Sequence, residues 1–165
     1  MNLEQAQPIA EKYRDALIPH CLPGYCKIAG STRREKPEVG DIEIVCVPLA
    51  YDTGLFTSGI ASVINPLVKI KGELPCKYTQ RMLPEGILLD LFICTPETFW
   101  LNFCIRTGSA DWVHQVLATR WTQLGYHSEG AILRRNGERH IVHSEQDLFA
   151  MLGMAWVEPR DRVMP

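Results

Sequence analysis

Apolar residues near the start of the chain recur every three or four positions. These residues are Leu3, Ala6, Ala10, Tyr13 and Leu17. This spacing places them on one face of an amphipathic helix. Pro19 and then Pro23-Gly24 follow. Because proline has no backbone N–H to donate, we predict that the helix ends before them.

Between residues 25 and 94, short apolar runs alternate with turn residues. The predicted strands are residues 25–29, 41–48, 68–71, 76–82 and 87–94. Glycine and proline, which interrupt strands, separate the later runs at Gly72 and at Pro84-Glu85-Gly86. Residues 57–64 are short and apolar enough for one helix. The run 87–94 is apolar except for one acid, which is typical of a strand buried on both faces.

The last third of the chain returns to helical spacing. The apolar residues that share a helical face here are Trp112, Val113, Val116, Leu117 and Trp121. They predict a helix over 111–124, which Gly125 ends. Residues 131–142 predict a hairpin, because Asn136-Gly137 favours a two-residue turn. A final helix is expected over 145–152, before the tail at Pro159.

Three acids stand out against this pattern. Asp41 and Glu43 alternate along a predicted strand and therefore share one face, although a solvated edge strand shows the same pattern. Asp90 is the lone acid of the run 87–94, where an unpaired buried carboxylate is costly. A divalent cation shared by the three acids would compensate that cost. A salt bridge between Asp90 and a distant arginine is the alternative.

A second group of residues lies just before these acids. Gly30-Ser31 is expected to end the strand predicted over 25–29 in a tight turn, and Arg34 follows shortly after. Glycine lets the backbone approach a ligand, and a serine hydroxyl and neighbouring N–H groups bind phosphate oxygens. The arginine fork adds a charged contact. An ordinary loop with solvated arginines is the alternative, and the nearby acids make a phosphate and metal site the favoured interpretation.

These residues resemble the signature of the polymerase X family, the DNA polymerase beta group of nucleotidyltransferases. The matching segments are Gly30-Ser31-x-Arg33-Arg34, Gly40-Asp41-Ile42-Glu43-Ile44, Leu89-Asp90-Leu91, Arg106-Thr107-Gly108-Ser109, residues 144–149 and residues 156–162. They occur in the family's order. The resemblance therefore extends from about residue 28 to 162.

The resemblance implies an α+β fold. A polymerase beta-like palm, with a mixed sheet and helices on one side, is expected over residues 1–104, and a small α/β thumb over 105–165. A length of 165 residues leaves no room for the family's lyase and fingers domains. We therefore expect the minimal palm-plus-thumb form, which a viral member of the family also has.

The resemblance also implies roles for individual residues. Asp41, Glu43 and Asp90 would be catalytic and would bind Mg²⁺, with Mn²⁺ as a substitute. The residues expected to bind the nucleotide are Gly30, Ser31, Arg34, Gly40, Arg106, Thr107, Gly108 and Ser109. Thr107, Gly108 and Ser109 would form a turn beneath the sugar, where the family has a cis peptide bond.

The chain departs from the family at several positions. Glu43 replaces an aspartate, Ile105-Arg106 replaces a Tyr-Phe pair that screens the sugar 2′ position, and Leu88 replaces an arginine. The helix after Ser109 is one residue longer than in polymerase beta. The side chains with which polymerase beta contacts the base and the template therefore have no counterpart in this chain. We therefore expect loose nucleotide selection, with dNTP and also NTP as substrates.

Charge and cysteine content limit the other possibilities. The net charge is −2, unusual for a nucleic-acid binder, but basic clusters remain. The predicted DNA contacts are Lys77, Arg81, Arg134 and Arg135; solvated surface charges are the alternative. The six cysteines have no zinc spacing and are expected to be reduced and buried. No apolar run is long enough to span a membrane.

We therefore predict a monomeric, soluble, cytoplasmic protein, with a phage or mobile-element host as one origin. Its expected partner is gapped or primed DNA, and its expected activity is nucleotide addition to a primer 3′-hydroxyl in gap filling or end repair. A small nucleotidyltransferase with a non-DNA acceptor, a template-independent terminal transferase and an inactive DNA-binding module are the alternatives.

Overall fold

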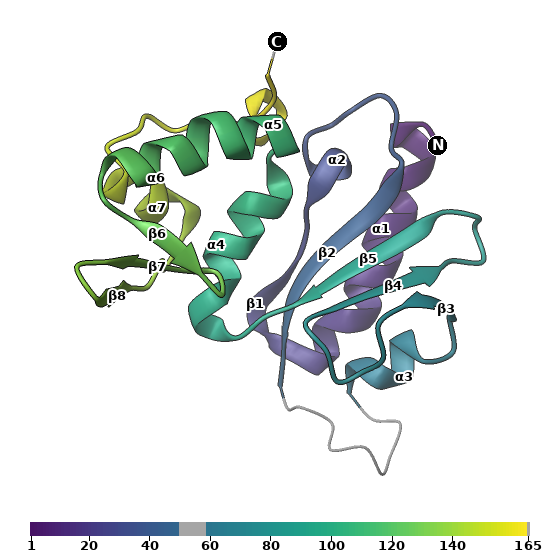
Figure 1. Ribbon diagram of the computed structural model, residues 1–165. Coiled ribbons are helices and arrows are strands. Elements are labelled where there is room, and N and C mark those ends of the chain that lie inside the picture. The colour runs from purple at the N-terminus through teal and green to yellow at the C-terminus, as the bar shows by residue number, and fades with distance from the viewer. Residues whose placement is uncertain (50–58, 165) are drawn as a thin grey trace.

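The computed structural model describes residues 1–49 and 59–164 and has an α+β fold built on a mixed five-stranded sheet (Figure 1). Its strands are β1 (Cys21–Ile28), β2 (Asp41–Pro48), β3 (Val68–Lys71), β4 (Tyr78–Met82) and β5 (Leu88–Ile93). The order across the sheet is β1-β2-β5-β4-β3. Strands β2 and β5 are parallel, and the other neighbours are antiparallel. The five predicted strands are confirmed.

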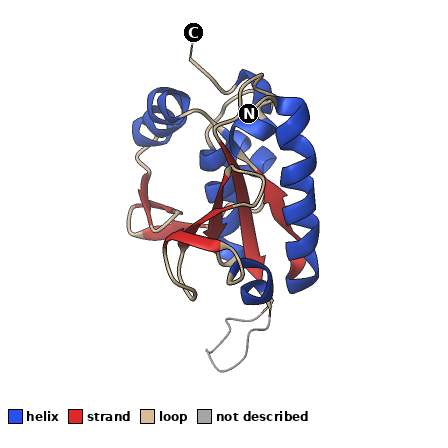
Figure 2. Cartoon of the chain, turned by 90° about the vertical axis from the view of Figure 1, so that its right-hand side faces the viewer, coloured by secondary structure: helices blue, strands red, loops and turns tan. Residues whose placement is uncertain are grey.

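One face of this sheet is covered by helices α1 (Leu3–Leu17) and α3 (Ile60–Ile64). Figure 2 shows α1 lying along the sheet. The predicted apolar positions of α1 are the ones that are buried, apart from Leu3, and they pack on Ile42, Ile44 and Leu89. Of the helix predicted over 57–64, residues 57 and 58 lie outside the described residues.

The opposite face is divided into two halves. Helix α4 (Pro96–Thr107) covers one half, where Phe99 and Phe103 pack with Val45 and Phe92 of the sheet. The other half carries the predicted acids and is open.

The first turn of α4 is held by reciprocal bonds between Thr95 and Thr98, a capping box that satisfies free backbone groups.

A smaller unit follows α4 and surrounds its own core. Its elements are α5 (Ala110–Trp112), π-helix η2 (Val113–Ala118), α6 (Thr119–Gln123), β6 (His127–Glu129), β7 (Ile132–Arg135), β8 (Glu138–His140), α7 (Glu145–Met151) and η3 (Pro159–Asp161). The Asn136-Gly137 hairpin is confirmed, with φ of 53° and 79°. Strand β6, which pairs with β7, was not predicted from the sequence.

Below, the palm is the five-stranded sheet with α1, the one-turn helix α2 (Gly30–Arg33) and α3, and the thumb is residues 110–164. Helix α4 joins the two, because Phe99 and Phe103 face the palm whereas Leu101 and Cys104 belong to the thumb core. The predicted boundary at residue 104 therefore falls inside a continuous helix.

The long thumb helix contains a π-helical segment. Residues 110–123 are helical throughout, with η2 in the middle, and the Thr119 hydroxyl donates to the His114 carbonyl five residues earlier (3.1 Å). In a π-helix the backbone N–H bonds to the carbonyl five residues earlier, which encloses one residue more than an α-helical turn. This segment is therefore where the extra residue expected in this helix can be accommodated.

Two further expectations concern the cysteines and membrane-spanning helices. The six cysteines are free thiols, and all but Cys76 are buried. Across residues 1–49 and 59–164, no helix has both the length and the apolar character needed to cross a bilayer.

Candidate active site

The parallel pairing of β2 and β5 brings the three predicted acids together. Glu43 lies directly opposite Asp90, and Asp41 lies opposite Leu88 two residues earlier. Residues opposite each other on neighbouring strands point to the same side of the sheet, as do residues i and i+2. The three carboxyl groups therefore share the open half of the face that α4 partly covers. Asp90 is half-buried, whereas Phe92 on the same face is buried, so β5 is buried on both faces in its second half and not at Asp90.

The positive charge around the carboxyl cluster does not balance the negative charge of its three acids. Burial, followed by the negative charge of Asp41, raises the pKa of Glu43 to about 7. Burial and then the charge of Asp90 raise the pKa of Asp41. The charge of Arg34 opposes both shifts. Raised carboxyl pKa values are expected where like charges meet in a desolvated site, and a divalent cation would reverse them.

Gly30 allows Glu43 to occupy its position. The glycine starts α2 with a φ of +62°, and a Cβ there would lie 1.7 Å from Glu43 Oε2. Any other side chain would therefore displace the carboxylate, besides adopting a backbone conformation that favours glycine. The tight turn predicted at Gly30-Ser31 is in fact one turn of helix.

Three polar atoms near this turn lack partners. Ser31 Oγ, Thr32 Oγ1 and Arg34 Nε are buried and have no hydrogen-bond partner among the described residues. Arg34 Nη1 donates to the Thr107 carbonyl (2.6 Å), and burial lowers the pKa of Arg34 against the charges of Glu43 and Asp41. Buried polar atoms are normally paired, so Ser31 Oγ and Arg34 Nε fit a phosphate ligand. Gly40 is exposed just before Asp41, with nothing near its Cβ position.

The end of α4 supplies the other predicted nucleotide residues. Arg106 places its guanidinium 4.1 Å from the centre of the Phe92 ring, and Phe92 follows Asp90 by two positions on the acid face. Gly108 packs tightly, since a Cβ there would lie 2.6 Å from the Trp112 ring. Ser109 Oγ accepts from the Trp112 N–H (3.2 Å) and caps the thumb helix.

The cis peptide bond expected in this turn is not found. Among the described residues, the cis peptide bond is the one between Leu74 and Pro75. A cis bond without proline costs about 3 kcal/mol. The glycine at 108 instead serves the close contact with Trp112.

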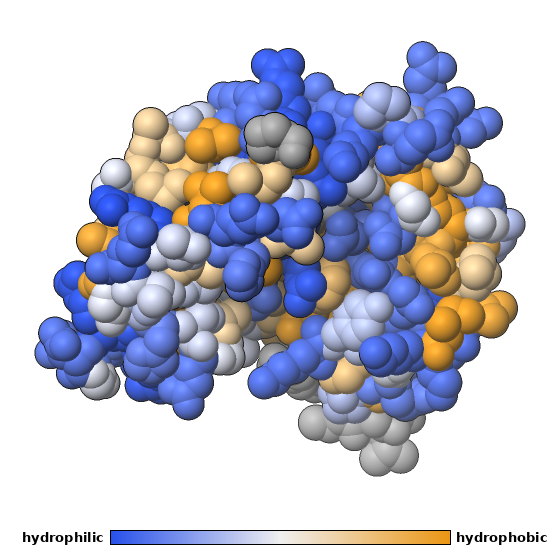
Figure 3. Space-filling view, turned by 45° about the horizontal axis from the view of Figure 1, so that its top comes forward, coloured by the Kyte–Doolittle hydropathy of each residue, from blue (hydrophilic) through white to orange (hydrophobic). Residues whose placement is uncertain are grey.

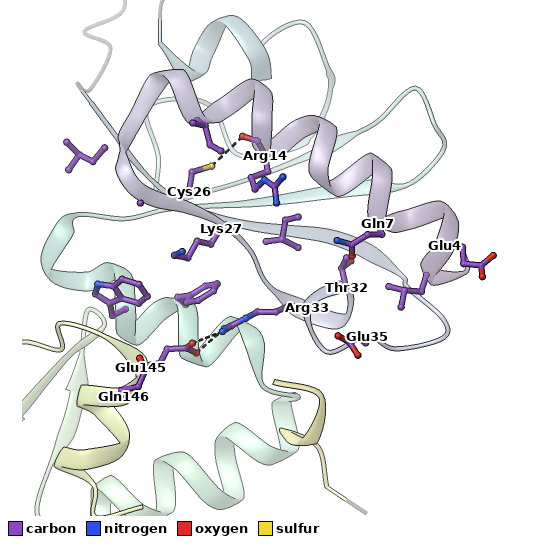
Figure 4. Close-up of a pocket in the computed structure, with 17 residues that line it drawn as sticks. Glu4, Gln7, Arg14, Cys26, Lys27, Thr32, Arg33, Glu35, Glu145 and Gln146 are labelled. Atoms are coloured by element: carbon purple, nitrogen blue, oxygen red, sulfur yellow. Dashed lines mark hydrogen bonds and ion pairs between the residues drawn. The ribbon is translucent and has the colours of Figure 1, made fainter. Parts of the chain in front are cut away.

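An ion-pair network joins the palm to the thumb (Figure 4). Arg33 donates to Glu145 through Nη2–Oε2 (2.6 Å) and Nη1–Oε1 (3.0 Å), and to Thr107 Oγ1 (2.6 Å). The buried Arg162 pairs with the same glutamate. Burial alone would raise the pKa of Glu145, but the bonds and charges of both arginines hold it below its usual value. A groove of about 1120 Å³ runs beside this network, between α1, β1 and α4.

The sequence did not indicate this network or the partners of Asp90. Tyr78 Oη (3.1 Å) and Gln80 Nε2 (2.7 Å) both donate to Asp90 Oδ1. Burial and then the charge of Asp90 raise the pKa of Tyr78 to about 12, so its hydroxyl remains a donor. Among the described residues Asp90 forms no ion pair, and the salt-bridge alternative is not supported. The alternation of β4, which points residues 78 and 80 to one face, was the available signal.

The predicted DNA contacts differ in how accessible they are. Lys77 is exposed. Arg81 is only 2% exposed, because it follows Gln80 on β4 and therefore points to the opposite face, where it donates to the Gly72 carbonyl (3.3 Å). The prediction that Arg81 contacts DNA is thus wrong. Arg134 pairs with Glu129 (2.8 Å), and Arg135 lies over the Tyr126 ring.

The protein side chains alone do not form a complete metal cage. In the part of the chain that the structure describes, no three His, Cys, Asp or Glu side chains converge as a ready ligand set for one ion. Mg²⁺ at phosphate-transfer sites takes only one or two carboxylates, and substrate phosphates and water complete its shell. The acid cluster and the unpaired Ser31 and Arg34 atoms therefore fit Mg²⁺ bound together with a phosphate.

The thumb matches a known family. Residues 104–163 match the family described as DNA polymerase beta thumb. The match starts near the end of α4 and ends just after η3, so it covers the whole smaller unit. It supports a polymerase beta-like relationship, a DNA polymerase type of protein and an interaction with DNA. No curated protein matches the chain. The expected α+β fold with a small thumb is confirmed.

The space between the two units is open to solvent on one face of the molecule. Figure 3 shows a notch between the thumb, on the left, and the palm, on the right, with mostly hydrophilic residues around it. The end of α4 lies against the acid face, because Arg106 covers Phe92 and Arg34 donates to the Thr107 carbonyl.

Proposed function

We propose that the protein is a DNA polymerase of the polymerase X type, which adds nucleotides to a primer 3′-hydroxyl in gap-filling or end-repair synthesis. The observation that carries the proposal is the pairing of Glu43 with Asp90 across parallel strands, with Asp41 on the same face. The match of the thumb to that of DNA polymerase beta supports it independently.

Asp41, Glu43 and Asp90 would hold Mg²⁺, for which Mn²⁺ can substitute. When bound, the ions neutralise the charge of a triphosphate and lower the pKa of a hydroxyl nucleophile. Asp41 and Glu43 would hold the ion nearest the triphosphate, while Asp90 would face the primer hydroxyl and accept its proton.

The residues around the acids would hold the nucleotide. Ser31 Oγ and the Arg34 guanidinium, with the backbone near Gly30 and Gly40, would bind the β- and γ-phosphates, because Ser31 Oγ and Arg34 Nε are buried and have no hydrogen-bond partner among the described residues. Thr107, Gly108 and Ser109 would support the sugar. The tight contact of Gly108 with Trp112 gives that turn a fixed shape, which favours in-line geometry.

Nucleotide selection would be loose. Arg106, at the position expected near the sugar, is a long side chain stacked on Phe92 and is exposed, so it forms no rigid wall against a 2′-hydroxyl. We therefore propose dNTP as the main substrate and NTP as an accepted one, with the protein acting as a monomer on gapped or primed DNA.

A template-independent terminal transferase is the second candidate. It is favoured by the loss of two of the four predicted DNA contacts, because Arg81 is buried and Arg134 is paired within the thumb. Weak phosphate contact would leave a template poorly held and make DNA binding sensitive to salt.

The test is an extension assay with Mg²⁺ or Mn²⁺ and labelled dNTP or NTP on gapped, primed and single-stranded DNA. Extension that follows the template base supports the polymerase, and extension of single strands without base preference supports the transferase. The absence of extension on every substrate would overturn both. Asp90→Asn is the control and should abolish extension, with the circular dichroism spectrum unchanged.

A further inference from the structure

The third acid of the site is held by two neutral side chains from the neighbouring strand. Gln80 on β4 is the direct cross-strand partner of Asp90 on β5, and Tyr78 lies two positions before it. Because the side-chain period of a strand is two, both side chains point to the acid face. They reach Asp90 from one side, with donor–acceptor distances of 2.7 Å for Gln80 and 3.1 Å for Tyr78.

Both donors bind the same oxygen of Asp90. Oδ1 accepts from the Gln80 amide and from the Tyr78 hydroxyl, which occupies both of its lone pairs. Asp90 Oδ2 has no hydrogen-bond partner within residues 1–49 and 59–164. The two oxygens are therefore unequal, and Oδ2 is the one left for a cation or for the proton of a substrate hydroxyl.

The nature of the donors matters as much as their position. An arginine in their place would neutralise Asp90 and compete with a cation for it. An amide and a phenol fix the rotamer of a carboxylate and leave its negative charge uncompensated. Asp90 therefore keeps its full attraction for a cation shared with Asp41 and Glu43.

Tyr78 is itself fixed by aromatic packing. Its ring stacks on Phe92 (centroids 5.2 Å apart, planes at 27°), and the Arg106 guanidinium covers Phe92 at 4.1 Å. A continuous stack thus extends from the end of α4 to the hydroxyl that binds Asp90. Packing of this kind restricts the rotamers of Tyr78 and so the direction of its hydrogen bond.

We propose that Gln80 and Tyr78 are positioning residues, which orient Asp90 so that Oδ2 takes part in cation binding. This inference rests on the proposed function only for its effect on catalysis; its effect on cation binding is independent of the reaction. Side chains that orient metal ligands in this way typically contribute about 10- to 100-fold in metal affinity or activity.

The test compares Gln80→Met and Tyr78→Phe with wild type by Mn²⁺ binding, followed by electron paramagnetic resonance of the free ion. Each substitution removes a donor and keeps the size of the side chain. We expect roughly 10-fold weaker Mn²⁺ binding for Gln80→Met and a smaller loss for Tyr78→Phe. Gln123→Met on the exposed end of α6 and Tyr25→Phe, whose ring packs on Phe99, are matched controls and should bind Mn²⁺ as wild type does.

A double-mutant cycle shows whether the two residues act through Asp90. In an Asp90→Asn background, Gln80→Met should have no further effect on Mn²⁺ binding, because the carboxylate it orients is gone. Equal effects in both backgrounds would overturn the proposal. So would Mn²⁺ binding unchanged by either substitution, or no Mn²⁺ binding by wild type.

Kinetics give a second readout if wild type extends a primer. Gln80→Met should lower kcat and raise the half-saturating Mg²⁺ concentration, both by roughly 10-fold, with the KM for the nucleotide within about 2-fold because other residues hold the triphosphate. A rise in KM alone would overturn the assignment. If wild type binds Mn²⁺ but extends nothing, the proposed function fails, and the binding cycle still decides the roles of Gln80 and Tyr78.

Discussion

Arg33 of the palm and Glu145 of the thumb form a two-pronged ion pair, with Nη2–Oε2 at 2.6 Å and Nη1–Oε1 at 3.0 Å. The pair connects residues from opposite ends of the sequence. Arg33 is in α2, beside the phosphate-binding candidates Ser31 and Arg34, and Glu145 begins α7. The position of the thumb is therefore linked to the turn that would hold a triphosphate.

Replacing Glu145 with alanine should destabilise the protein strongly. The glutamate is 3% exposed and also pairs with Arg162, which is fully buried. Its removal leaves a buried guanidinium without a counter-charge, which costs about 3–5 kcal/mol. Urea unfolding measures the loss. The exposed pair of Glu97 and Arg139 provides the control, because Glu97→Ala should stay within about 1 kcal/mol of wild type. Equal losses in the two variants would contradict the assignment.

The same glutamate should make stability depend on acid pH. The pKa of Glu145 in the folded state is below the unfolded value of 4.5, so its pairing contributes fully above that pH and is lost as pH falls through the folded pKa. The unfolding free energies of wild type and Glu145→Gln should therefore differ by a constant amount well above pH 4.5 and converge as the pH falls below that value and through the folded pKa. Urea titrations at several pH values give both curves. A difference that stays constant would show that ionisation of Glu145 contributes nothing.

Much of the palm was predictable from local pattern. Alternation and apolar runs gave the five strands, and the spacing of apolar residues gave α1, because these elements bury one regular face. The acids of the site were predictable for a similar reason. Asp41 and Glu43 differ by two residues on a strand, and Asp90 is an acid with no neighbouring base in its run.

Interactions between distant segments were harder to predict. The pairing of Gln80 with Asp90 depends on the register of β4 against β5, which single-strand patterns do not specify. Arg81 was misassigned because a one-residue difference decides which face a strand residue occupies. The Arg33–Glu145 pair joins segments that only the packing of α4 against palm and thumb brings together. Short strand β6 carries no apolar alternation and is held by its pairing with β7.

Repulsion within the acid cluster should lower the stability of the fold when no cation is bound. Glu43→Gln removes a charge that is buried beside Asp41 and Asp90. At about pH 8 the wild-type Glu43 side chain is ionised. In the presence of a chelator the substitution should therefore stabilise the fold by about 1–3 kcal/mol at this pH. The variant should also lose extension activity. Melting temperature with EDTA measures the first effect, and Glu38→Gln, at a highly exposed side chain, is the control. A lower melting temperature for Glu43→Gln would argue against repulsion in the cluster.

The unpaired polar atoms of the turn should act on nucleotide affinity. Ser31→Ala removes the buried Oγ, and Arg34→Met removes the guanidinium while keeping a long side chain. Because both groups would contact phosphates in ground and transition states alike, we expect the KM for the nucleotide to rise, by roughly 10-fold for Ser31→Ala and more for the charged contact. Steady-state primer extension measures it. Ser62→Ala, at an exposed position of α3, should change nothing, and an unaltered KM in both site variants would remove them from the phosphate site.

Gly30→Ala should inactivate the protein through a single methyl group. The added Cβ would lie 1.7 Å from Glu43 Oε2, so either the carboxylate or α2 must move, and a shift of about 1 Å in a catalytic group costs about 100-fold in rate. Gly24→Ala is the matched control, because Gly24 also has a positive φ of 82° but has nothing within 4 Å of its Cβ position. Both variants carry the backbone cost of alanine at positive φ, about 1 kcal/mol. Only Gly30→Ala disturbs the acid cluster, so extension and Mn²⁺ binding should fall in that variant and stay near wild type in Gly24→Ala. Loss of both properties in Gly24→Ala as well would mean that backbone strain, and not displacement of Glu43, explains the effect.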